Sequence, residues 1–174
     1  MTVILFVCLH LTKKKSTMST IYATLERLKI SLPPAATPAA SYQPFCISGP
    51  MVYLSGHIAK KDGAAWVGQL GLTMNTAEGQ EAAASVAIDL MGTLQAACQS
   101  IGKDLEAVKQ IVKVTSLVNS TPEYTQQHLV TNGCSNLLAE VFQTRGLHAR
   151  SAFGVAQLPL GACVEIEMVV ELNA

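Results

Sequence analysis

The last part of the chain alternates between apolar and polar residues. From Ala162 to Leu172, one set of alternate positions is apolar: Val164, Ile166, Met168 and Val170. The positions between them include three carboxylates, Glu165, Glu167 and Glu171. Side chains alternate between the two faces of a strand, so this pattern predicts a strand with one buried face. His148 to Gln157 predicts another strand, and because Leu158 to Gly161 indicates a turn, we expect the two strands to form a β-hairpin.

Helical spacing is strongest in the middle of the chain. Between Asn75 and Ile101 apolar residues recur every three or four positions, and Glu78 stands where a capping box with Asn75 requires it. A second helix is predicted from about Pro122 to Phe142, because proline is favoured at the first helical position. Ser19 to Ile30 predicts a short amphipathic helix.

The remaining apolar segments predict strands. Tyr42 to Ser48 and Met51 to Ile58 flank the turn signal Gly49-Pro50, Ala65 to Gly68 can add a short edge strand, and Val108 to Val118 predicts a long strand. The resulting order is β-β-(β)-α-β-α-β-β. It predicts an α+β domain in which two long helices pack on one face of a mixed, mostly antiparallel sheet.

The chain has 174 residues, which suits a single domain with a substantial core. Residues 1–17 differ from the rest, because a short apolar run is followed by three lysines and the segment has no acidic residue. The run is shorter than the roughly 20 residues that span a bilayer, and the features of a signal peptide are missing. We expect residues 1–17 to be a non-native start or a tail, residues 18–174 to form the domain, and the protein to have no membrane partner.

Composition narrows the possible partners. Twelve basic residues balance twelve acidic ones and form no stripe, so we expect no binding to nucleic acid. Five widely spaced cysteines without a CxxC pair indicate neither zinc nor disulfides, but reduced thiols in a cytoplasmic protein. No metal or cofactor is expected. Because 49% of the residues are hydrophobic and only 14% are charged, we expect other subunits to cover part of the surface.

Arg150 is the candidate for chemistry. The chain has three arginines, and Arg150 alone lies inside a predicted core strand, where an unpaired guanidinium would be costly. Its planar fork matches a carboxylate in two parallel hydrogen bonds. Glu165 lies across the predicted hairpin, where it can pair with Arg150 or share a pocket with it. The sequence pattern leaves both a structural ion pair and a substrate site open.

The same segment resembles a known family. The run from His148 to Pro159 (HARSAFGVAQLP), followed by Val164 to Glu167 (VEIE), is similar to the signature that closes proteins of the RidA/YjgF family, also labelled endoribonuclease L-PSP. Those proteins have an arginine-serine strand, a Leu-Pro turn and an (I/V)-E-(I/V)-E strand. Earlier matches are Tyr42, Ser55-Gly56 and Val112 to Thr115, so the resemblance covers roughly Tyr42 to Leu172.

The resemblance implies a chorismate-mutase-like fold of the bacillus type, a homotrimer and one cleft at each subunit interface, without a cofactor. In that cleft, Arg150 would hold the carboxylate of a 2-imino or 2-enamino acid, and Glu165 would orient the water that releases ammonia and leaves a 2-keto acid. Tyr42 would line the cleft, and Ser55 and Asn132 are weaker matches for its polar wall. Related deaminases often have cysteine or threonine two residues after the arginine, where this chain has Ala152.

Two hypotheses follow for the function. The first is an enamine/imine deaminase, a hydrolase acting on C=N bonds. The alternative is a non-catalytic protein of the same family that binds a small carboxylate through Arg150. The family's older label as ribonuclease is a third interpretation, and the absence of a basic stripe argues against it.

Overall fold

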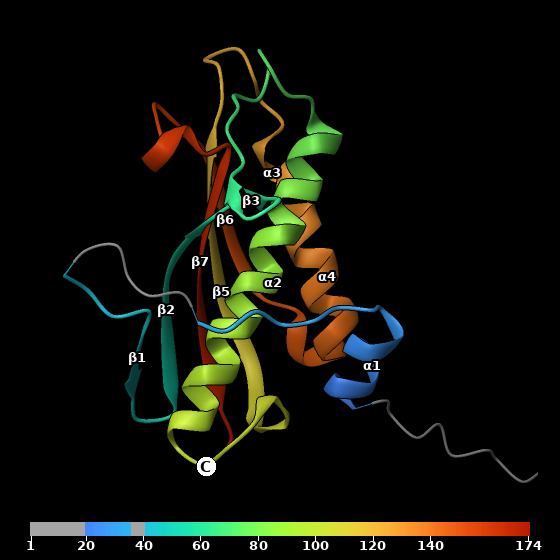
Figure 1. Cartoon of the computed structure of the whole chain (residues 1–174), viewed down its shortest axis with the longest axis vertical. Coiled ribbons are helices and arrows are strands. Elements are labelled where there is room, and N and C mark those ends of the chain that lie inside the picture. Colours follow the sequence, from blue (N-terminus) through green and yellow to red (C-terminus); the bar gives the residue numbers. More distant parts are fainter. Residues whose placement is uncertain (1–19, 36–40) are drawn as a thin grey trace, which may run out of the picture.

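A five-stranded sheet forms the centre of the molecule. The structure is a computed structural model that describes residues 20–35 and 41–174. The strands are β1 (Phe45–Ser48), β2 (Met51–Ile58), β5 (Val108–Asn119), β6 (Ala149–Val155) and β7 (Val164–Leu172). Their order across the sheet is β1-β2-β7-β5-β6 (Figure 1). The β5–β6 pair is parallel and the other three pairs are antiparallel, so the sheet is mixed and mostly antiparallel, as predicted.

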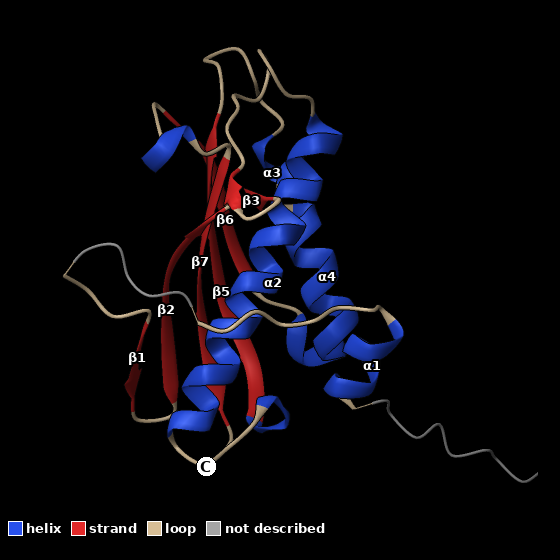
Figure 2. Ribbon diagram, in the orientation of Figure 1, coloured by secondary structure: helices blue, strands red, loops and turns tan. Residues whose placement is uncertain are grey.

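Two helices, α2 (Thr76–Ser100) and α4 (Asn132–Phe142), cover one face of this sheet (Figure 2). We call this the helix-covered face and the opposite one the open face. The capping box predicted for α2 is present, because the Asn75 side chain accepts from the Glu78 backbone N–H and Glu78 accepts from that of Asn75. The shorter helices are α1 (Ile21–Arg27), which contacts α4, and α3 (Gln127–Val130), which precedes it. The prediction of two helices on one face is confirmed.

The alternation in β7 decides which face is buried. Its apolar residues lie on the helix-covered face with an exposed fraction of 1% or less: Val164, Ile166, Met168 and Val170. Glu165, Glu167 and Glu171 alternate with them on the open face. Three 3₁₀ turns and a small hairpin complete the described elements: η1 (Leu105–Ala107), η2 (Gln143–Gly146), η3 (Pro159–Gly161), and β3 (Lys60–Lys61) with β4 (Ala64–Ala65).

The predicted C-terminal hairpin is wrong. β6 does not pair with β7, because β5 lies between them and bonds to both. The chain from β5 passes through α3 and α4 and returns as β6, parallel to β5 at the sheet edge. Residues 156–163 then carry the chain past β5 through η3 to β7, so a segment that indicated a tight turn is a crossing connection.

The second long helix begins later than predicted. Pro122 lies in a turn in which the Tyr124 N–H donates to the Thr121 carbonyl, and the helical region starts at Gln127. The reason is tertiary, since Thr121 N–H donates to the Leu70 carbonyl and ties this segment to a distant loop. The predicted tail, residues 1–17, lies outside the described residues.

Candidate active site

Arg150 extends from β6 over the helix-covered face. Its Nη1 donates to Oδ1 of Asn132 at 2.9 Å and to Oγ of Ser135 at 3.1 Å, both on α4. Its Nη2 donates to the backbone carbonyl of His128 at 3.1 Å. Among residues 20–35 and 41–174, no carboxylate forms a salt bridge with Arg150. The structural ion pair that the sequence left open is therefore not formed within this part of the chain.

The hydrogen bonds of Arg150 leave part of its guanidinium available. Both Nη1 hydrogens and one Nη2 hydrogen are used, whereas Nε–H and the second Nη2 hydrogen have no partner among the described residues. An Nε–H and an Nη2–H together form the edge of a guanidinium that meets the two oxygens of a carboxylate. The two unused donors of Arg150 are therefore of the kind that bind a carboxylate.

A serine and a histidine adjoin the arginine. The ring of His148 lies with Nδ1 at 2.6 Å from the Gly146 carbonyl and Nε2 at 3.0 Å from Oγ of Ser135. A carbonyl oxygen only accepts, so in the neutral imidazole Nδ1 carries the proton and Nε2 accepts from the Ser135 hydroxyl. Burial lowers the pKa of His148, and the positive charge of Arg150 lowers it further. The hydrogen bond to the Gly146 carbonyl acts in the opposite direction and raises it. Burial and the charge of Arg150 both favour the neutral imidazole.

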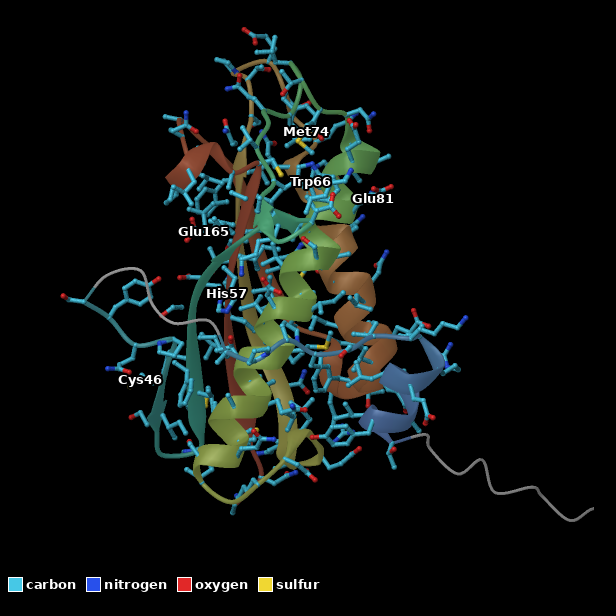
Figure 3. All side chains as sticks on the ribbon, in the orientation of Figure 1. Cys46, His57, Trp66, Met74, Glu81 and Glu165 are labelled. Carbon is cyan, nitrogen blue, oxygen red and sulfur yellow. The ribbon has the colours of Figure 1, made fainter. Side chains whose placement is uncertain are left out.

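Glu165 lies on the open face, across from Ile58 of β2 and Leu117 of β5. Figure 3 shows its side chain on the side of the sheet away from α2. The carboxylate packs against Gly56, where an added Cβ would overlap Oε1 of Glu165. Burial raises the pKa of Glu165, and the like charge of Glu167 raises it further. A carboxyl group with a raised pKa is suited to acid–base work.

Ser55 lies near Glu165, and a hydrogen bond joins it to the segment that contains Tyr42. Ser55 precedes Gly56 at an irregularity in the β2–β7 pairing, and its hydroxyl donates to the Gln43 carbonyl at 2.7 Å. This bond ties the bulge to the segment that begins with Tyr42, whose side chain is 49% exposed. His57 supports the bulge from the other side, with Nδ1 at 2.8 Å from the Ser55 carbonyl and Nε2 at 2.8 Å from Thr93 Oγ1 on α2.

The five predicted site residues thus form two groups. Arg150 and Asn132 are hydrogen-bonded on the helix-covered face, whereas Ser55 and Glu165 belong to the open face, and Tyr42 lies in the loop segment bonded to Ser55. Register explains the separation. Arg150 lies beside Val114, which faces the helices, while Glu165 lies across from Leu117, an odd number of residues farther along β5. The interpretation that a hairpin lets Arg150 and Glu165 of one chain pair or share a pocket is wrong, because one chain holds them on opposite faces.

Sequence reasoning missed Ser135 and His148. The signal for His148 was its position two residues before Arg150, which places both side chains on one face of an extended segment. The signal for Ser135 was its spacing of three from Asn132, which puts both on one side of a helix. Neither spacing identifies a site until it is known that Arg150 lies beside α4.

The cysteines give little indication of chemistry. Cys98, Cys134 and Cys163 are buried, and burial raises the pKa of the Cys134 thiol to about 12 and those of the other two to about 11. Thiols in this state are poor nucleophiles. In the described ranges no group of three or more His, Cys, Asp and Glu side chains is arranged to hold a metal ion.

The model of the endoribonuclease L-PSP family matches residues 33–172. The chain therefore belongs to this family, which is also known as the RidA/YjgF family. Protein TCP17 of Trypanosoma cruzi is 46% identical over 155 residues, which cover 88% of this chain and 94% of that protein.

Solved structures agree with this assignment. The protein Atu1372 from Agrobacterium tumefaciens, whose function is unknown, is 37% identical, with a TM-score of 0.79 over 89% of this chain and 93% of that one. A Shewanella oneidensis protein provisionally assigned as an endoribonuclease is 26% identical, with a TM-score of 0.83 over 88% of this chain and all of that one. The predicted chorismate-mutase-like α+β fold is confirmed. None of the helices in residues 20–35 and 41–174 combines the length and apolarity that crossing a membrane requires.

Proposed function

We propose that this protein hydrolyses 2-imino and 2-enamino acids to 2-keto acids and ammonia. The observation that carries the proposal is the guanidinium of Arg150, which is held by three hydrogen bonds while its Nε–H and one Nη2 hydrogen remain available for a carboxylate. Membership of the RidA/YjgF family supports the same chemistry at the level of the family. Ala152, where related deaminases often have cysteine or threonine, offers the substrate no polar contact.

The reaction needs little from the protein beyond positioning. Water adds to the C=N carbon, the nitrogen accepts protons, and the C–N bond breaks to give a C=O group and ammonia. Glu165, whose pKa is raised by burial and by Glu167, would accept a proton from the attacking water and return it to the leaving nitrogen. Holding imine and water together supplies much of the acceleration, because it converts an encounter in solution into a reaction within one complex.

We further propose that two copies of the chain complete each cleft in a homotrimer. Arg150 and Glu165 lie on opposite faces of one sheet, so a cleft that uses both needs the open face of one subunit against the arginine of the next. The open face also carries large exposed apolar side chains, with Tyr53 47% and Phe153 46% exposed. One heterologous contact repeated around a three-fold axis closes a ring of three subunits.

The activity is tested by coupling an amino-acid oxidase, which generates a panel of imino acids, to semicarbazide, which traps the imine that remains. We expect the wild-type protein to accelerate the loss of imine above the uncatalysed rate, and Arg150→Ala to give no acceleration. Asn136→Ala is the matched control, because Asn136 is an exposed residue of α4 close to the site in sequence. If the folded wild-type protein accelerates no imino acid in the panel, the protein is not a deaminase, and the small-carboxylate-binding alternative replaces the proposal.

Mixing subunits tests the shared cleft. Arg150→Ala and Glu165→Gln should each be inactive as pure proteins. After joint refolding in equal amounts, about a quarter of the interfaces should combine an intact Arg150 with an intact Glu165, since a heterologous ring uses a different patch from each neighbour. Recovery of about that fraction of wild-type turnover is expected. No recovery, in trimers shown by mass spectrometry to be mixed, would place both residues of each cleft on one subunit.

A further inference from the structure

We propose that Ser135 and His148 are positioning residues that fix the guanidinium of Arg150 in the orientation that binds the carboxylate. The inference rests on the function proposed above, and neither residue belongs to the set that the family resemblance implies. It follows from a continuous series of hydrogen bonds that runs from the Gly146 carbonyl through His148 and Ser135 to Arg150.

The direction of each bond in this series is determined. Because the Gly146 carbonyl can only accept, His148 donates from Nδ1, and in the neutral imidazole it presents an unprotonated Nε2 to Ser135. The single hydroxyl hydrogen of Ser135 is then used toward His148. The lone pairs of the same oxygen remain for Nη1 of Arg150, at 3.1 Å. His148 therefore orients the hydroxyl so that it can only accept from the arginine.

This arrangement restricts rotation of the guanidinium. Ser135 and Asn132 lie three residues apart on α4, so both face Arg150 and together occupy the two Nη1 hydrogens. The His128 carbonyl takes one hydrogen of Nη2. With these contacts in place, the Nε–Nη2 edge is the part of the group left for a ligand. Orienting that edge before binding saves the entropy that a freely rotating side chain would lose.

A competing interpretation is that the serine and histidine only support the fold. Ser135 and His148 are both partly buried, and they connect α4 to the start of β6. A structural role predicts that their removal lowers the unfolding midpoint. A positioning role predicts altered motion of Arg150 and weaker carboxylate binding in a protein of normal stability. The two roles therefore differ in measurable ways.

The first measurement is the NMR spectrum of the arginine guanidinium groups in the full chain. The chain has three arginines, and Arg150→Lys identifies the signals of Arg150 by their loss. In the wild type we expect separate signals for the Nη protons of Arg150, because the bonds to Asn132 and Ser135 slow rotation. Ser135→Ala and His148→Leu should average these signals. Ser135→Thr and His148→Gln, which retain a hydroxyl and an acceptor, should restore them.

The second measurement is calorimetric titration with pyruvate, a small 2-keto acid, together with turnover. Losing one hydrogen bond to a charged group should raise Kd and KM about tenfold in Ser135→Ala, with a smaller change in kcat. The Asn136→Ala variant should match the wild type. Unfolding midpoints of all variants should agree with that of the wild type.

The outcomes separate this inference from the proposed function. If Ser135→Ala leaves the Arg150 signals and the pyruvate affinity unchanged, or weakens binding only as far as it destabilises the fold, the positioning role is wrong. If the signals respond as expected but the wild-type protein neither binds pyruvate nor hydrolyses imino acids, Arg150 is positioned by these residues and the proposed function is wrong.

Discussion

The helix-covered face and the open face of the sheet hold the two halves of the candidate site by different means. On the helix-covered face, Arg150 is fixed by three hydrogen bonds to Asn132, Ser135 and the His128 carbonyl. On the open face, Glu165 has no hydrogen bond or ion pair with any described residue, and its carboxylate is located by packing against Gly56. One group is oriented by a polar network, and the other is located by shape.

The difference suits the two tasks. A group that must meet both oxygens of a carboxylate needs a defined direction, which a planar donor held by several acceptors provides. A group that exchanges protons with water needs a suitable pKa, which partial burial provides for Glu165. Substitutions in the arginine half should therefore change the stability of the fold and the orientation of Arg150. Substitutions in the Glu165 half should change catalysis while the fold stays stable.

The largest effect should come from packing on the helix-covered face. An added Cβ at Gly133 on α4 would overlap the backbone carbonyl of Gln80 on α2, so Gly133→Ala must push the two helices apart. Overpacking of this kind destabilises a fold by about 1–3 kcal/mol. Asn132, the neighbouring residue, would move and release Arg150. Urea unfolding should show the loss of stability, and an unchanged midpoint would mean that α2 and α4 tolerate a wider spacing.

The matching change on the open face is Gly56→Ala. Here the added Cβ meets the end of the flexible Glu165 side chain rather than the backbone, so the carboxylate can move aside and the fold remains. We expect little change in the urea midpoint. We expect kcat to fall at least about tenfold, because a positioned acid–base group contributes about 10²–10⁴-fold. Full turnover by this variant would show that Glu165 is not needed where the structure places it.

Elements with a strong local pattern could be predicted from the sequence. The capping box of Asn75 and Glu78 and the apolar face of β7 depend on residues close together in the chain, and both are present. The partner of β6 could not be predicted in this way. β6 looked like one arm of a hairpin because nothing within residues 148–172 records that β5 lies between β6 and β7.

The same limit applies to the candidate site. Arg150 was predicted from its residue type and strand context, and the structure adds Asn132 as a direct partner at 2.9 Å. Its distance from Glu165 could not be predicted, because it depends on which strands are neighbours and on which face each residue lies. Ser135 was missed because a serine on a helix has many ordinary roles. Its significance depends on the arginine that a later strand brings beside it.

The smallest effect concerns the pKa of Glu165 and distinguishes the two causes that raise it. A base works when deprotonated, so kcat/KM should fall as the pH decreases through the pKa of Glu165, which lies above its ordinary value of 4.5. This fall forms the acid limb of the pH profile of kcat/KM. Glu167→Gln removes the like charge and should move the acid limb to lower pH. Burial, the larger cause, remains in the variant, so the limb should stay above the position of an ordinary carboxyl group.

Glu171→Gln is the control for this shift, because Glu171 lies on the same face of β7 but pairs with Lys109 at 2.8 Å. Removal of the Glu171 charge should leave the acid limb of the pH profile at the same pH. If both variants shift the limb equally, the change reflects the net charge of the face rather than a local effect on Glu165. If Glu167→Gln moves the limb to higher pH, a group other than Glu165 controls it. In that case the open face contributes shape to the cleft, while the proton transfer belongs to another residue.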